Sequence, residues 1–176
     1  VKDVTVSQSV VHSFHDCDFE SISGKILYFR SGGTAEIRGG SWIMTKTGRA
    51  IHLEDATGSG IGTSNKYFAF YGTKFEWQHG DEDDTELTYA PLFYNKSVGK
   101  IAFENCNFAQ FTDAGHQYTT YDHGHIDKRG SVVFRGCYLP EIVTFKTTVD
   151  GGDVGTSTPR LIFDGCELTS QVYDMV

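Results

Sequence analysis

A six-residue pattern occurs six times along the chain, and this repeat constrains the fold more than any other feature. The third residue of each copy is Gly, Asn or Asp, the types that most readily adopt a left-handed backbone conformation. Consecutive copies are offset by 23, 33, 33, 31 and 29 residues. We therefore predict one sharp bend of the chain in every repeat. The copies are residues 14–19, 37–42, 70–75, 103–108, 134–139 and 163–168.

Apolar residues alternate on both sides of each bend, as expected for two short strands that share one buried face. The first residue of each copy is Phe or Ile, and the residue two positions earlier is mostly apolar. After the bend, a small residue comes first and a large apolar residue follows two positions later. A further strand is predicted before five of the bends, at residues 25–30, 50–54, 91–95, 121–127 and 142–148.

Three strands in about thirty residues, with equivalent residues stacked on one another, are typical of a parallel β-helix. We predict an all-β solenoid of about six coils with three short strands per coil, in which residues 1–176 form a single domain. A β-sandwich or barrel would also use short strands and turns, but neither gives a reason for six copies of one bend. Because Val1 falls inside a repeat unit, we expect the chain to be part of a longer protein.

Residues 101–108, Ile-Ala-Phe-Glu-Asn-Cys-Asn-Phe, and their equivalents resemble the pectate-lyase-like right-handed β-helix superfamily. The resemblance covers nearly the whole chain and rests on core and turn residues. It implies a right-handed β-helix. The superfamily includes polysaccharide lyases, glycoside hydrolases and phage tailspikes. The resemblance also implies a polysaccharide partner, an extracellular or virion (tail) location and a homotrimer. Because neither end of the solenoid looks capped, we expect a homotrimer or further coils of a longer parent chain to cover the ends. No catalytic signature of that superfamily is recognisable, so no active-site residue is carried over.

Charge and hydropathy exclude two classes of partner. The net charge of −8 does not provide the basic surface that nucleic-acid binding requires. The chain has no run of about eighteen apolar residues, so we expect no membrane insertion.

All four cysteines occupy the same inward position of the repeat, directly after the bend. On consecutive coils, Cys106, Cys137 and Cys166 would form a column whose parallel side chains are poorly oriented for disulfides. We therefore predict buried, reduced thiols, and no zinc site, because stacked ligands cannot converge tetrahedrally. The outward position before the bend reads Glu104, Arg135 and Asp164 on the same coils, which predicts a row of opposite charges.

Function in a repetitive scaffold concentrates where the repeat is lengthened. Residues 78–89 and 109–120 are acidic or polar insertions, and both precede the first strand of the next coil. They should therefore emerge on one side of adjacent coils. Insertions 55–66 and 150–159 are rich in Gly, Ser and Thr and belong to another edge.

The predicted strand 121–127 lies between the two polar insertions and is the least hydrophobic strand. If Gly124 and Ile126 point inward, alternation places two histidines outward, since burying them without partners would be costly. The outward residues are Tyr121, His123, His125 and Asp127. One strand spacing away we expect Lys146 or Thr144 of the next coil and Phe93 or Asn95 of the previous coil.

This surface is suited to a saccharide. In a catalytic version, pairs of carboxylates act as general acid and base on a glycosidic bond, while histidine transfers a proton. The candidate catalytic residues are Glu82, Asp83, Asp122, His123, His125 and Asp127. The candidate substrate-binding residues are Trp77, His116, Tyr118, Tyr121 and Lys146. We expect no cofactor, although the acidic run from Asp81 to Asp84 is an alternative cation site.

Two functions follow from this pattern. The first is a secreted or tailspike-like β-helix that binds, and in one version cleaves, a bacterial or plant polysaccharide. The second is a non-catalytic receptor-binding protein or structural shaft of a virion or cell-surface adhesin. Whether the chain is an enzyme stays open, and a lyase or a glycoside hydrolase is the expected class if it is one.

Overall fold

The computed structural model describes twelve segments of the chain, which form strands and bends and contain no helix. Within these segments, accordingly, no helix is long and apolar enough to cross a membrane. The described residues are 4–6, 11–21, 25–29, 33–45, 49–54, 66–78, 92–96, 99–110, 124–127, 130–139, 145–148 and 160–168.

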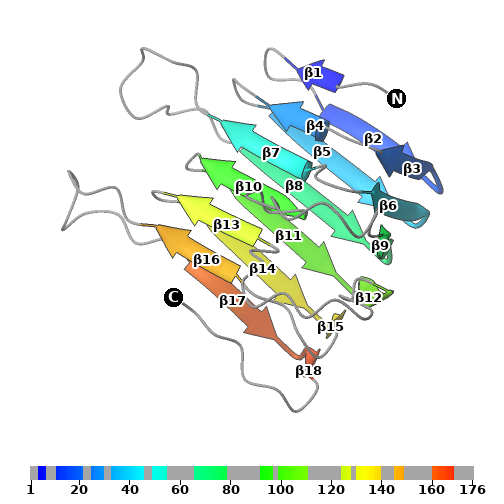
Figure 1. Ribbon diagram of the computed structural model, residues 1–176, viewed down its shortest axis with the longest axis vertical. Helices are drawn as coiled ribbons and strands as arrows, with labels where there is room; N and C mark the ends of the chain where they lie inside the picture. The colour runs from blue at the N-terminus through cyan, green and yellow to red at the C-terminus, as the bar shows by residue number, and fades with distance from the viewer. Residues whose placement is uncertain are drawn as a thin grey trace, which may run out of the picture.

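The strands form three parallel sheets, and every third strand along the chain joins the same sheet (Figure 1). Sheet A contains β1 (Val4–Val6), β4 (Lys25–Phe29), β7 (Arg49–Glu54), β10 (Phe93–Lys96), β13 (Gly124–Asp127) and β16 (Phe145–Thr148). Sheet B contains β2 (Val11–His15), β5 (Gly33–Arg38), β8 (Lys66–Tyr71), β11 (Lys100–Glu104), β14 (Ser131–Arg135) and β17 (Arg160–Asp164). Sheet C contains β3 (Asp18–Ser21), β6 (Ser41–Thr45), β9 (Lys74–Gln78), β12 (Asn107–Gln110), β15 (Tyr138–Leu139) and β18 (Glu167–Leu168). The predicted all-β class is confirmed.

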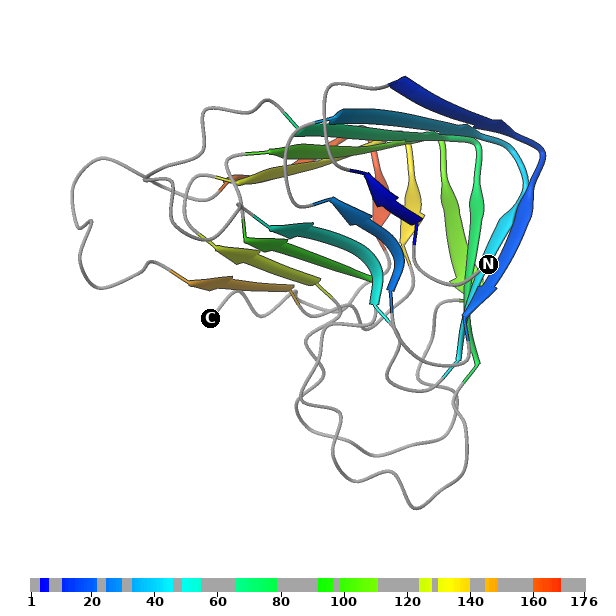
Figure 2. The ribbon, with the colours of Figure 1, turned by 90° about the horizontal axis from the view of Figure 1, so that it is seen from above.

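Below, one round of three strands is called a coil. Successive coils contribute neighbouring strands to each sheet, and Figure 2 shows the three sheets arranged around a common interior. The register within sheet B keeps equivalent residues side by side, since Phe103 pairs with both Phe70 and Phe134. The offsets between repeats seen in the sequence are therefore the lengths of successive coils.

The bend between sheets B and C is left-handed in every described coil, as the repeat predicts. Backbone φ at the third repeat position lies between 50° and 68°. The amide of each bend residue from Asp16 to Gly136 donates to the carbonyl oxygen that precedes the bend of the next coil, at 2.9 Å from Gly72 to Glu104 and 2.8 Å from Asn105 to Arg135. The backbone bond ladder thus continues through the bend. The bend residues are Asp16, Gly39, Gly72, Asn105, Gly136 and Gly165.

The core lies between the three sheets and consists largely of aromatic side chains. In sheet B, Phe103 stacks on Phe70 and Phe134, with ring centroids 5.2 and 4.7 Å apart. It also meets Phe108 of sheet C edge-on at 5.5 Å and lies 6.3 Å from Phe93 of sheet A. One buried ring therefore joins neighbouring coils and all three sheets.

Candidate functional site

Four of the predicted site residues lie in described strands, and only their backbone positions are described. Trp77 lies in β9 of sheet C, where it pairs with Met44. His125 and Asp127 lie in β13, and Lys146 lies in β16, which are neighbouring strands of sheet A. The remaining predicted residues lie outside the described segments: Glu82, Asp83, His116, Tyr118, Tyr121, Asp122 and His123, together with the acidic run 81–84.

The register of sheet A brings two of the predicted residues side by side. His125 pairs with Lys146 on one side and with Tyr94 on the other. The prediction that Phe93 or Asn95 would lie beside the outward residues of β13 was therefore wrong. They pair instead with Gly124 and Ile126, and their side chains are fully buried. The reason is alternation, because Tyr94 lies one residue from each and belongs to the opposite face.

The two polar insertions lead into adjacent strands of sheet A. Residues 79–92 connect β9 to β10, and residues 111–123 connect β12 to β13. β10 and β13 are paired in parallel from Phe93 to Asn95 (Figure 1). Both connections also leave sheet C, so they join the same two sheets on consecutive coils. The site predicted from sequence is thus centred on β10, β13 and β16.

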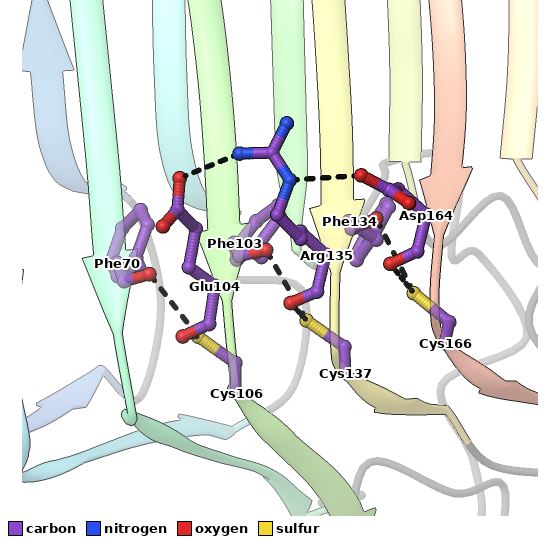
Figure 3. A network of polar contacts seen from close by, with 9 residues as sticks. All are labelled: Phe70, Phe103, Glu104, Cys106, Phe134, Arg135, Cys137, Asp164 and Cys166. Carbon is purple, nitrogen blue, oxygen red and sulfur yellow. Dashed lines mark hydrogen bonds and ion pairs between the residues drawn. The ribbon is translucent and has the colours of Figure 1, made fainter.

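A second polar surface lies on the outer face of sheet B and is described in full. Arg135 donates from Nε to Asp164 Oδ2 at 3.0 Å and from Nη1 to Glu104 Oε1 at 3.2 Å (Figure 3). The predicted row of opposite charges is therefore confirmed. The Asp164 hydrogen bond and the Glu104 charge raise the pKa of Arg135. Because the Arg135 and Asp164 side chains are more than half exposed, this row adds little to stability.

Two tyrosines continue the outer face of sheet B and were missed in the sequence. The guanidinium of Arg38 lies 4.2 Å from the ring centre of Tyr71, and Lys100 Nζ lies 5.7 Å from that of Tyr67. Burial, together with the hydrogen bond to Tyr71, raises the pKa of Tyr67 to about 12. Their spacing of four residues within one strand was the signal, since such residues share a face.

The ring faces of these tyrosines already carry cations, and both carboxylates of the charged row are bound to Arg135. Between the tyrosines, Ala69 is buried although strand alternation places it on the outer face, and the same holds for Ala102 and Val133 on the next coils. The charged and aromatic groups of this part of sheet B are thus paired with one another.

The cysteines are unbridged, as predicted. Cys106 and Cys137 are buried, whereas Cys17 and Cys166 are only half-buried, so the prediction that all four are buried was wrong for these two. They occupy the first and last of the described bends, where a neighbouring coil covers one side only. Burial raises the pKa of Cys106 and of Cys166. At the centre of the column, hydrogen bonding with the Cys106 thiol outweighs burial and lowers the pKa of Cys137.

One small hollow lies on sheet C. It measures about 150 Å³ and is lined by Lys74, Phe75, Asn107 and Ala109. This volume is below the range of typical small-molecule sites, about 300–1,000 Å³, so the hollow is not the candidate site.

Comparison with known proteins finds no match to this chain among family models, curated proteins or solved structures.

Proposed function

We propose that the chain is a right-handed parallel β-helix that engages a polysaccharide on the outer face of sheet A, around β13. The observation that carries this proposal is the entry of both polar insertions into adjacent, paired strands, β10 and β13. A binding groove needs side chains from several segments in one place, and these insertions begin and end at neighbouring positions. An extracellular or virion-borne protein, trimeric or continued by further coils, is the setting that we propose with it.

The residues of this region have the chemistry that saccharides require. The register partners His125 and Lys146 supply nitrogen donors for hydroxyl or carboxylate groups of a sugar. Asp127 follows two residues later in β13. The insertions add the carboxylates and aromatic rings named above, which suit the general acid and base roles at a glycosidic bond and stacking on sugar rings.

A non-catalytic shaft or adhesin is the second candidate. It is favoured by the outer face of sheet B, where Arg135 bridges Glu104 and Asp164 and Ala69 and Ala102 are buried. A face whose groups pair with one another suits a rigid structural element. The first candidate binds a polysaccharide and in one version cleaves it, whereas the second forms no product and, as a structural shaft, needs no saccharide ligand.

The test is incubation with a panel of bacterial and plant polysaccharides, read by binding, by new reducing ends and by ultraviolet absorbance of unsaturated uronates. We expect at least one polysaccharide to bind. Reducing ends without unsaturated uronates would identify a hydrolase, unsaturated uronates a lyase, and binding without product an adhesin.

Matched variants test the location. His125→Ala combined with Lys146→Ala should abolish binding, whereas Arg135→Ala on sheet B should leave binding unchanged. Circular dichroism verifies that both variants are folded. Equal binding by the two variants would place the ligand elsewhere, and no binding across the panel would contradict the proposed function.

A further inference from the structure

Three consecutive coils place a thiol at the same position, directly after the bend between sheets B and C (Figure 3). One backbone hydrogen bond per coil fixes this stacking. The amide of Tyr138 donates to the Cys106 carbonyl oxygen at 3.2 Å, and the amide of Glu167 donates to that of Cys137 at 2.9 Å. Thr73 precedes Cys106 in the same column, since the amide of Asn107 donates to its carbonyl oxygen at 3.0 Å.

The middle of this column is buried and contains an unsatisfied polar group. Cys106 and Cys137 are at most 2% exposed, and Thr73 is fully buried. Among the described residues, the Thr73 hydroxyl oxygen has no hydrogen-bond partner, which is unusual for a buried hydroxyl. Each thiol donates to a carbonyl oxygen of the preceding coil, Cys106 to Phe70 at 3.5 Å and Cys137 to Phe103 at 3.3 Å.

We propose that Cys106 and Cys137 form a two-coordinate site for a soft monovalent cation of the Cu(I) type. This inference is independent of the polysaccharide proposal, because the column lies in the interior and uses none of its residues.

The spacing of the coils matches the geometry of such an ion. Adjacent parallel strands lie about 4.8 Å apart, and metal–thiolate bonds are only slightly longer than about 2 Å, with a value of about 2.3 Å for zinc, so one ion between two stacked thiolates spans a distance close to the strand spacing. Within the described segments, no group of three or more His, Cys, Asp or Glu side chains converges on one point. A tetrahedral ion therefore lacks ligands here, whereas a two-coordinate ion needs only the stacked pair, and thiolates select soft metals such as Cu(I).

Binding displaces two protons and involves no change of oxidation state. The sulfur–hydrogen bonds of both thiols break, two sulfur–metal bonds form, and two protons leave to solvent. The bound thiolate of Cys106 then becomes an acceptor for the Thr73 hydroxyl, which lacks one in the thiol form. Cys137 and Cys166 form the next stacked pair, but Cys166 is half-buried and so gives less protection from water.

The test uses the full chain under anaerobic conditions, after a thiol assay has confirmed four free cysteines. Cu(I) is supplied as its bicinchoninate complex, and loss of the colour of that complex measures transfer to the protein. We expect one Cu(I) per folded chain and, at a pH low enough to keep both thiols protonated, two protons released per ion. Cys106→Ser and Cys137→Ser should each abolish the transfer.

Two further variants serve as matched controls. Cys17→Ser removes a thiol from the same bend position of a coil whose neighbour in the column is Gly40, and Cys166→Ser removes the half-buried thiol. Both should retain one Cu(I) per chain. The proposal would be overturned if no Cu(I) were transferred to the folded wild-type chain. It would also be overturned if Cys17→Ser lost as much bound Cu(I) as Cys137→Ser. If Cys106→Ser or Cys137→Ser is unable to fold, the number of protons released per ion, and the amount of Cu(I) bound by Cys166→Ser, still distinguish one paired site from binding to separate thiols.

Discussion

Glycine serves two different purposes at the bends. Gly72 has a backbone φ of 63° and open space where a Cβ would lie, so only its conformation favours glycine. At Gly40, φ is 66° and a Cβ would collide with the backbone carbonyl of Cys17 in the neighbouring coil. Backbone atoms cannot move aside as a flexible side chain can, so the two positions should differ in tolerance.

Gly72→Ala should lower the free energy of unfolding by about 1–2 kcal/mol, which is the cost of a left-handed conformation for a residue with a Cβ. Gly40→Ala should lower it further, because the steric collision adds to the same cost. Urea denaturation followed by circular dichroism gives both values. Equal losses would mean that the two coils are not in contact at Gly40.

The raised pKa of Tyr67 predicts how the free energy of unfolding changes at high pH. Burial and the hydrogen bond to Tyr71 raise its pKa from 10.0 to about 12, so the folded state favours the neutral phenol. The stabilisation is complete below pH 10 and is lost as pH rises from 10 to about 12, where the unfolded chain ionises first. Denaturation at a series of pH values should show a steeper loss in the wild-type chain than in Tyr67→Phe. Parallel curves would indicate that Tyr67 titrates normally.

Residue types at the bends were predictable from the sequence, since only Gly, Asn and Asp adopt φ near +60° readily and the structure has them there. The pair Tyr67 and Tyr71 was not recognised, because alternation gives their shared face but not the cations that cover their rings. Whether the Thr73 hydroxyl finds a hydrogen-bond partner likewise depends on which groups of neighbouring coils lie within reach. The sequence does not show which groups these are.

At the scale of strands, the ring stack of sheet B holds neighbouring coils together. Phe103 is fully buried and touches rings of the coils on both sides as well as rings in sheets A and C. Its removal should therefore disturb contacts in both neighbouring coils and in all three sheets at once.

Phe103→Ala should lower the free energy of unfolding by about 3–5 kcal/mol, the usual cost of truncating a buried aromatic residue. Phe163→Ala is the matched control, because Phe163 is only partly buried at the edge of the same stack and should cost less. Chemical denaturation of both variants provides the comparison. If Phe163→Ala lowered the free energy of unfolding as much as Phe103→Ala, the placement of the core would be contradicted.

Strand locations and the register of sheet B followed the sequence closely, whereas the register of sheet A did not. The predicted strand 121–127 contains β13, Gly124–Asp127, and the predicted strand 91–95 overlaps β10, Phe93–Lys96. The neighbour of His125 nevertheless proved to be Tyr94, because a one-residue difference in register reverses the face of every side chain. Among the described residues, the left-handed bend residues lie between sheets B and C, so none adjoins sheet A from which its alignment could be counted.

For the whole molecule, the sequence predicted three strands per repeat and hence which insertions enter neighbouring strands. The candidate site could be located only to that extent, because the conformations of residues 79–91 and 111–123 do not follow from the repeat. The pairing of β10, β13 and β16 gives the scaffold of the site, and the saccharide contacts remain a proposal for the experiments above.

Both the polysaccharide face and the thiol pair depend on parallel, in-register stacking of the coils. Nuclear Overhauser contacts between backbone protons of a uniformly labelled chain test this stacking most directly. The register predicts amide-to-α-proton contacts that join residues 101–104 to residues 132–135, and those to residues 161–164. Close α-proton pairs between antiparallel strands that are neighbours in sequence, as in a sandwich or meander, would contradict the stacking and both proposals with it.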